Sequence, residues 1–211
     1  MALLNVNPTR MELTRLKRRL KTAVRGHKLL KDKRDEMMRR FVLLIRENAK
    51  LRERVERELS KALGEFALCR GLMEPEALEE AVMYPARTVE LTVGSRNIMS
   101  VDVPTLAVEA GEARLSYGLA GTTAQLDGSI ARLAELLPEL LKLAEIEKTC
   151  NMLADEIEKT RRRVNALEYV MIPDLEETIR FIAMKLDENE RGSLTRLMKV
   201  KEMIFERDRV V

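Results

Sequence analysis

Apolar residues recur at alternating spacings of three and four in two long stretches of the chain. The first runs through Leu13–Val55 and, after a shift of one residue, through Leu59–Met73. The second builds up from about Thr123 and is most regular over Leu143–Met171. Such a stripe, held over so many turns, predicts helices packed lengthwise on another helix. We therefore expect a mainly α fold, in which the two segments pair as a long antiparallel two-helix coiled coil.

Start and stop signals set the expected limits of these helices. A tail of residues 1–8 precedes Thr9 and Glu12, whose spacing is that of a capping box, so the first helix is predicted over 9–75. The second is predicted over 123–207, with a bend or bulge near Pro173, which lacks a backbone N–H. Its stripe continues less strictly through Leu197, Val200 and Ile204. Antiparallel pairing would place Met1 and Val211 at the same end of a single elongated domain.

The insert between the helices, roughly 82–122, has the period of two that is typical of strands. Thr88–Val93 and Ile98–Val103 alternate, with Gly94–Asn97 between them as the expected turn. This predicts a short β-hairpin over about 88–103, near the turn-around end of the helix pair. One row of the hairpin would hold Val89, Leu91 and Val93, and the other Met99, Val101 and Val103.

Composition narrows the class of protein. Charged residues make up 35% of the chain and aromatic residues 3%, with no Trp, whereas 45% are hydrophobic. This balance is typical of a long coiled coil rather than of a compact enzyme or a disordered chain. Cys69 and Cys150 fall on the apolar stripes, so we expect them to be small core residues in a reducing compartment. No apolar run approaches the roughly 20 residues of a membrane span. We therefore expect a cytoplasmic location without direct membrane insertion.

The charges are unevenly distributed, although the net charge is only +3. Residues 10–40 hold 13 Lys or Arg and 4 Asp or Glu, a local excess of +9. Such a basic end suits an acidic protein surface, a nucleic acid or simply a solvated helix flank. Arg161, Arg162 and Arg163 point about 100° apart on a helix. They therefore form a collar, which would serve either as a solvated face with a Glu158–Arg162 pair or as a contact ring for an acidic partner.

The chain contains no evident catalytic constellation. His27 is the only histidine and lies on the apolar stripe, which favours a structural role. The glycine-rich stretch Tyr117–Thr123 lacks the spacing and the lysine of a phosphate-binding loop, so a linker is favoured. We accordingly expect no catalytic, cofactor-binding or metal-binding residues and no cofactor. Function must come from what the chain binds.

Three segments resemble signatures of one family, the D subunits of the V-type (A/V-type) rotary ATPases. They are Asn5–Leu13, Gly26–Asp35 and Glu156–Glu168, and Ile172-Pro173 follows the last of them as in that family. The resemblance implies a central rotor shaft that is not itself an enzyme. Such a shaft couples ATP hydrolysis or synthesis to rotation of a membrane ring and to transport of H⁺ or Na⁺.

The same resemblance implies partners and sites. The paired termini would enter the hexamer of A and B subunits, while the lower part would bind the small F subunit and the funnel-shaped subunit above the ring. As part of this complex, the chain would lie at the periphery of the membrane. The hairpin would modulate ATPase activity, and Val210 and Val211 would act as a pivot. Residues expected against acidic walls inside the hexamer are Arg10, Arg15, Arg18, Arg25, Lys28, Arg191, Arg196 and Lys199.

Two other interpretations remain open on the residues alone. A basic coiled coil using residues 10–40 would bind nucleic acid, although its arginines are spread around the helix and few aromatic residues are present for stacking. A stalk-like coiled coil would serve a secretion-type ATPase, but such a stalk needs no hairpin insert.

Overall fold

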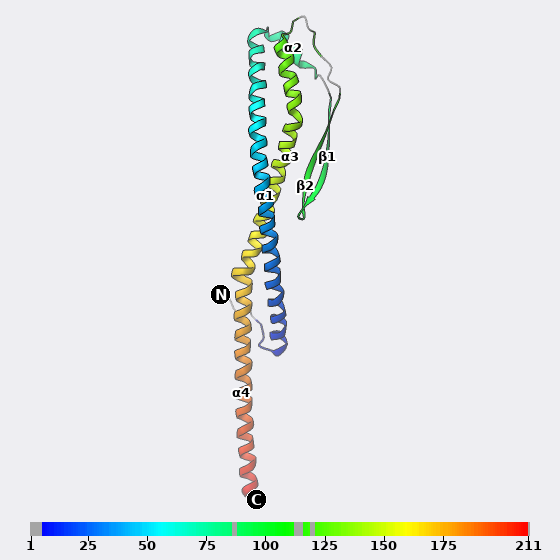
Figure 1. Ribbon diagram of the computed structural model, residues 1–211. Helices are drawn as coiled ribbons and strands as arrows, with labels where there is room; N and C mark the ends of the chain where they lie inside the picture. The colour runs from blue at the N-terminus through cyan, green and yellow to red at the C-terminus, as the bar shows by residue number, and fades with distance from the viewer. Residues whose placement is uncertain (1–5, 86–87, 112–115, 119–120, 211) are drawn as a thin grey trace. The chain divides into compact units, whose positions relative to one another are not determined.

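The computed structural model describes residues 6–85, 88–111, 116–118 and 121–210, with the side chains of 110 and 206–210 left out. It confirms a mainly helical fold with a two-stranded antiparallel hairpin between long terminal helices (Figure 1). The elements are α1 (Arg10–Leu72), α2 (Pro75–Met83), β1 (Val89–Ile98), β2 (Val101–Ala110), α3 (Ala124–Ala166), the π-helical turn η1 (Leu167–Met171) and α4 (Ile172–Val210).

The chain divides into two compact units, which we describe separately. Unit 1 contains the chain up to Asp35 and from Glu158 onward, and unit 2 spans Glu36–Ile157. The expected single elongated domain, with its predicted limits, stays a prediction.

Unit 1 is an antiparallel helix pair held by an apolar stripe from each helix. Its buried residues are Leu16 and Ala23 of α1 with Leu175 and Ile182 of the facing α4. Partly buried leucines and isoleucines extend this core on both helices; they are Leu13, Leu20, Leu167, Ile172, Ile179 and Leu186. The direction of pairing follows from two contacts between the helices, Arg10 with Glu190 and His27 with Glu168.

At the start of α1, one of the two hydrogen bonds of the expected capping box forms. The Glu12 amide donates to the Thr9 hydroxyl over 3.2 Å, which satisfies one free N–H of the first turn. The Glu12 carboxylate does not return this bond. It accepts from Arg15 instead (3.3 Å), and the Thr9 amide donates to the Asn7 carbonyl (2.9 Å).

The C-terminal helical segment is interrupted by one wide turn just before Pro173. The Ile172 amide donates to the carbonyl of Leu167, five residues earlier, which defines the π-helical turn η1. Proline has no N–H for the regular ladder, so a local widening at this point leaves the flanking helices intact. The wider turn also changes the helical phase. Met171, which the sequence placed on the apolar stripe, is therefore 40% exposed.

Unit 2 turns the chain around at the end of α1. Pro75 does not simply end a helix; it opens the short helix α2, where its fixed φ and missing N–H are tolerated. The core here joins α1, α2 and the start of α3, and its buried members are Cys69, Met73, Leu78, Ala81 and Leu126. Tyr117 donates to Asp127 over 2.5 Å and so fastens the preceding loop to α3.

Both cysteines are buried and free. Burial, aided by the charge of Glu147, raises the pKa of the Cys150 thiol. A smaller thiolate fraction makes this thiol less reactive, which agrees with a packing role.

The hairpin turn is not where the alternation of the sequence predicted it. Residues 94–97 belong to β1, and the chain reverses at Met99 and Ser100, whose φ angles are 53° and 71°. Asn97 stabilises this tight turn, because its side chain accepts from the Ser100 amide (3.0 Å) and donates to Asp102 (2.6 Å).

Gly94 has a different role from that of a turn residue. It faces Thr105 across the pair, and a Cβ on Gly94 would lie 2.7 Å from the Thr105 hydroxyl oxygen. A side chain at this position would require the Thr105 side chain to shift, so glycine favours the close cross-strand approach.

The corrected register separates the predicted hairpin residues onto two faces. Val101 and Val103 are buried against Met37 of α1 and Leu153 of α3. Ile98 and the half-buried Met99 pack at the edge of this cluster. On the opposite face Val89, Leu91 and Val93 are exposed, opposite Ala110, Val108 and Leu106. The Leu106 amide also donates to the Glu145 carboxylate of α3 (3.3 Å).

Candidate partner-binding surfaces

The C-terminal part of α4 carries an apolar stripe that none of the other described residues of unit 1 covers. We call residues 191–210 the α4 extension, because α1 begins at Arg10, which pairs with Glu190, and α4 continues beyond that point (Figure 1). At 1.5 Å per residue the extension is about 30 Å long. Its large apolar side chains are between 48% and 65% exposed; they are Leu194, Leu197, Met198, Val200, Met203, Ile204 and Phe205.

This exposure corrects the prediction that Leu197, Val200 and Ile204 lie within the intramolecular stripe. The expected position of Met1 and Val211 at the same end of the pair concerns residues that lie outside the described ranges. Leu186 is the last residue of α4 in the core of unit 1. The physical reason is one of length, because α1 has no residues left with which to cover the rest of α4.

The predicted basic residues of the extension are all exposed. Arg191, Arg196 and Lys199 have no ion-pair partner among the side chains that the structure describes. The Lys201 ammonium lies 5.6 Å from the centre of the Phe205 ring, within range of a cation–π contact. The extension therefore combines free positive charge with exposed apolar area.

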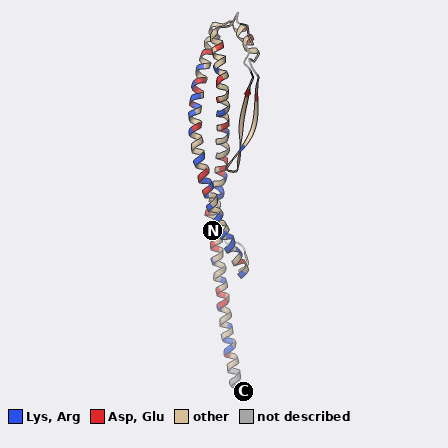
Figure 2. Cartoon of the chain, turned by 45° about the vertical axis from the view of Figure 1, so that its right-hand side comes forward, with Lys and Arg blue, Asp and Glu red and all other residues tan. Residues whose placement is uncertain are grey.

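The predicted basic residues of α1 divide into paired and free groups. Arg10 contacts Glu190 (3.6 Å) and Arg15 contacts Glu12 (3.3 Å), both at exposed positions where screening keeps such pairs weak. Arg18, Arg25 and Lys28 are exposed and have no ion pair within the described part of the chain. Figure 2 shows acidic residues interspersed with basic ones farther along α1, whereas residues 13–31 hold eight Lys or Arg and no Asp or Glu.

The predicted arginine collar is exposed at all three positions. Arg162 forms an ion pair with Glu158 one turn earlier, as the spacing suggested. Arg161 and Arg163 have no such partner among the described side chains. Arg162 thus pairs within its own helix, while Arg161 and Arg163 remain available for an external contact.

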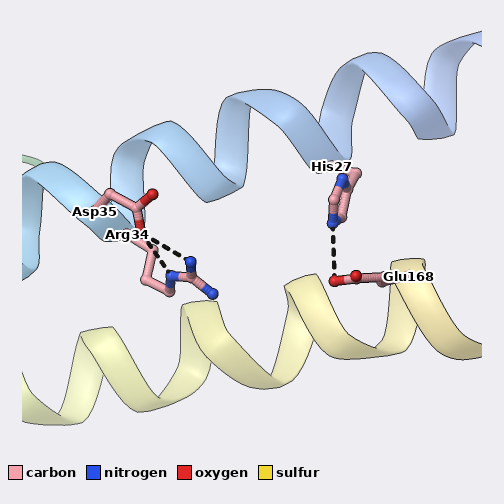
Figure 3. Close-up of polar contacts among 4 residues, drawn as sticks. All are labelled: His27, Arg34, Asp35 and Glu168. Carbon is pink, nitrogen blue, oxygen red and sulfur yellow. Dashed lines mark hydrogen bonds and ion pairs between the residues drawn. The ribbon is translucent and has the colours of Figure 1, made fainter.

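His27 is engaged within unit 1, as a structural role requires. Its Nε2 lies 3.3 Å from the Glu168 carboxylate in η1, and its side chain is 19% exposed (Figure 3). Arg34 reaches toward the facing helix, but both of its hydrogen bonds go to Asp35 on α1, at 3.0 Å and 2.8 Å. The His27–Glu168 contact joins the two helices, whereas the Arg34–Asp35 contacts lie within α1.

Some exposed apolar positions had no counterpart in the sequence analysis. Tyr169 and Val170 of η1 are 70% and 58% exposed, because the wide turn directs them outward. Pro173 was the one available signal for this change. A groove between α1 and α2 was also missed, since α2 itself was not predicted.

The described residues contain no group of three or more His, Cys, Asp or Glu arranged to hold a metal ion. None of the helices in the described ranges combines the length and apolar character that crossing a membrane requires.

Comparison with known proteins assigns the chain to a family. Residues 12–202 match the family described as the D subunit of ATP synthase. The V-type ATP synthase D subunit of Clostridium botulinum (strain Langeland) is 58% identical over 209 residues, which cover 97% of each chain. The corresponding protein of Clostridium novyi is also 58% identical, and that of Acetivibrio thermocellus is 57% identical over 98% of this chain and 95% of its own.

Proposed function

Because this chain belongs to the family of ATP synthase D subunits and is thus a component of a rotary ATPase, we propose that it is the central rotor shaft of that complex. In this role it transmits torque between the A/B hexamer and the membrane ring. The ring then moves H⁺ or Na⁺ as ATP is hydrolysed, or ATP is made as the ions flow back. The chain itself is non-catalytic and peripheral to the membrane, on its cytoplasmic side.

The α4 extension carries this proposal. A single helix whose large apolar side chains are each about half exposed is marginal by itself, so it calls for a surrounding partner. We place the extension within the hexamer, where Arg191, Arg196 and Lys199 run against acidic walls. Arg10, Arg15, Arg18, Arg25 and Lys28 of α1 form the continuation of that contact. Weak and screened ion pairs suit this site, because a turning part must exchange its contacts repeatedly.

Rotation follows from asymmetry of the shaft. ATP binding and hydrolysis close the subunits of the hexamer in turn, and a shaft without threefold symmetry fits each arrangement in only one orientation. Each closure therefore biases the shaft toward its next orientation. The small F subunit and the funnel-shaped subunit bind elsewhere along the shaft. The collar of Arg161–Arg163 provides a further contact site for a partner. The proposed pivot falls on Val210 and Val211, of which Val211 and the Val210 side chain lie outside the described residues.

Hexamer binding tests the proposal directly. The purified chain is mixed with a reconstituted A/B hexamer, with and without the F subunit, and stoichiometry and ATPase rate are measured together. We expect one chain per hexamer and an altered turnover. Salt-sensitive retention on DNA or RNA without hexamer binding would instead support the nucleic-acid interpretation.

A matched pair of variants localises the contact. We expect R191Q/R196Q/K199Q to weaken hexamer binding roughly tenfold, because three charge contacts of about 0.5 kcal/mol each are lost. The control, R46Q/K50Q/R54Q, removes three exposed charges from unit 2 and should change affinity less than about twofold. Equal losses in both variants would mean that general charge, rather than the extension, drives binding.

Truncation separates folding from coupling. Deleting residues 202–211 should leave the helical content of the rest unchanged by circular dichroism, since the described side chains in this range are exposed. We expect the truncated chain to lower ion pumping relative to ATP hydrolysis in the reconstituted complex. An unfolded product would contradict this expectation.

A further inference from the structure

The two edges of the hairpin in unit 2 have different surroundings. The outer edge of β2 lies next to α3, where the Leu106 amide donates to the Glu145 carboxylate (3.3 Å). Pro104 also interrupts that edge, because proline has no N–H to offer to a further strand. No described segment pairs with β1 on the side away from β2, and residues 89–97 are all exposed. The hairpin therefore has one covered edge and one open edge.

The register of the hairpin identifies the backbone groups at the open edge. The Gly111 amide donates to the Thr88 carbonyl (3.1 Å), in continuation of the β1–β2 register. In an antiparallel ladder every second residue bonds to the partner strand, and the residues between them point away from it. The outward amide of Leu106 agrees with this alternation, because Leu106 is opposite Val93. The residues of β1 whose N–H and C=O groups point to the open edge are Val89, Leu91, Val93, Ser95 and Asn97.

The strand β1 lacks the features that usually keep an open edge from pairing. Natural edge strands are commonly short, or they carry Lys, Pro or a bulge. In contrast, β1 is ten residues long, contains neither Lys nor Pro and pairs with β2 without a bulge. Val89, Leu91 and Val93 add exposed apolar side chains along it. Such a strand is a template for the addition of a further strand.

Two charged side chains of β1 specify which strand fits beside it. Glu90 is opposite Glu109 of β2, and like charges at directly opposed positions are unfavourable. Arg96 is opposite the apolar Val103. Neither Glu90 nor Arg96 forms an ion pair with another described side chain. The open edge therefore favours a strand that brings a positive charge to Glu90 and a negative charge to Arg96.

We propose that β1 pairs antiparallel with β1 of a second copy of this chain, with Val93 opposite Val93 of the other copy. This register places each Glu90 opposite Arg96 of the other copy, so one pairing forms two contacts of opposite charge. Val93 then occupies a hydrogen-bonded position, and Glu90 occupies a non-hydrogen-bonded position, where side chains lie closer together. The pairing has two-fold symmetry and therefore closes as a dimer with a four-stranded sheet.

Other parts of this chain do not fit the open edge. The backbone N–H groups of a helix are bonded within the helix, so the α4 extension cannot add a strand to the sheet. The outer edge of β2 is covered by its contact with Glu145 and interrupted by Pro104. Of the two strands that the structure describes, β1 alone has both an open edge and the complementary charges.

Sedimentation equilibrium of the purified chain tests the pairing. A single strand pair makes a small interface, so loading concentrations of roughly 5–500 μM are needed. We expect the average mass to rise from that of one chain toward that of two over this range. E90R or R96E alone should weaken the dimer at least roughly tenfold, because both charge contacts become repulsive. The control E135R, at an exposed site elsewhere in unit 2, should change the affinity less than twofold.

Mixing the two variants tests the register. E90R carries only positive charge at the two positions and R96E only negative charge, so each complements the other. An equimolar mixture, and likewise the double variant E90R/R96E, should regain the original affinity to within about threefold. Val93→Pro removes an N–H that points away from β2, so the hairpin should persist while the dimer is lost. Circular dichroism verifies that each variant is folded.

Spin labels locate the contact. A nitroxide attached at V93C, in a C69A/C150A background, should show a spectrum broadened by its neighbour in the dimer, because opposite residues of paired strands lie about 5.5 Å apart at Cα. The same label at L197C, on the α4 extension, should show no such broadening.

Several results would overturn the proposal. They are a chain that stays monomeric over the whole range, single charge variants that dimerise normally, a mixture that regains no affinity, or an unweakened dimer of Val93→Pro. Broadening at position 197 instead of position 93 would assign self-association to the α4 extension. Because these measurements need no other subunit, their outcome is separate from that of the rotor role.

Discussion

Two stretches of the same helix, α4, have similar apolar spacing and opposite surroundings. Leu175 and Ile182 are buried against α1, whereas Leu197 and Ile204, farther along, are more than half exposed. The difference arises because α1 begins at Arg10 and cannot cover α4 beyond Glu190. A helical apolar stripe thus predicts that a helix has a partner, but it does not say whether the same chain supplies that partner.

The largest expected effect is on the free energy of unfolding, in a comparison of one buried residue of α4 with one exposed residue. Ile182→Ala removes side-chain volume from a fully buried site and should lower the free energy of unfolding by about 2–4 kcal/mol. Ile204→Ala, at a 55% exposed site, should change it by less than about 0.5 kcal/mol. Urea unfolding followed by circular dichroism measures both. Equal losses would show that the extension is covered in solution, and a dependence on protein concentration would identify self-association as the cause.

The hairpin offers the same contrast in unit 2. Val103→Ala opens space against Met37 and should cost roughly 1–3 kcal/mol of stability, because Val103 is only 1% exposed. Val93→Ala lies on the opposite, exposed face and should be close to neutral for folding. The measurement is again urea unfolding, combined with ATPase rate in the reconstituted complex.

Such point variants are sharper than deletion of the hairpin. Removing 86–104 would also uncover Met37 and Leu153 and leave β2 without its partner strand. If the hairpin modulates turnover through its exposed face, Val93→Ala should alter the ATPase rate without altering stability. A changed rate for Val103→Ala alone would instead show that modulation of the ATPase rate depends on packing of Val103 against Met37 and Leu153.

The sequence predicted those features that depend on periodicity and local chemistry. The paired helices, the hairpin and the Thr9 cap follow from residue types at short spacings. It failed where two segments meet. Gly94 suggested a turn, but it lies within β1, in close approach to Thr105 of β2. Met171 suggested a core position until η1 changed the phase of the helix.

The candidate surfaces show the same limit. Exposed charges such as Arg191 and Lys199 were recognisable from residue type, because charged side chains are rarely buried. The apolar part of each surface was not recognisable, since Leu197 has the pattern of a core residue and is exposed only because α1 is too short. The groove needed knowledge of α2, whose nine residues carry too few turns for a periodic signal.

A smaller effect is expected from the one polar atom that is buried without a partner among the described residues, Oδ1 of Asn48. Asn48→Leu should raise the free energy of unfolding by about 1 kcal/mol, because it removes an unsatisfied acceptor from the helix interface. That corresponds to a rise in the thermal midpoint of roughly 2–4 °C for a chain of this size. The control Asn165→Leu, at an exposed site, should leave the midpoint unchanged. A destabilised Asn48→Leu would mean that the amide contributes a contact needed for register.

The smallest effect uses two helical glycines to ask where cooperative folding of unit 1 ends. A Cβ at Gly26 or at Gly192 would meet nothing within 4 Å, so alanine adds helix propensity at either site without a clash. Gly26 lies beside the paired core of unit 1, and Gly26→Ala should raise the free energy of unfolding by up to about 1 kcal/mol.

Gly192 lies in the α4 extension, where local opening does not require unit 1 to unfold. Gly192→Ala should therefore slow hydrogen exchange of nearby amides and raise helical content slightly, with little change in global stability. Hydrogen exchange by mass spectrometry, beside urea unfolding, distinguishes the two outcomes. If Gly192→Ala stabilised the whole unit as much as Gly26→Ala, the extension would unfold together with the core. The contrast between the two stretches of α4 would then be one of exposure alone and not of folding.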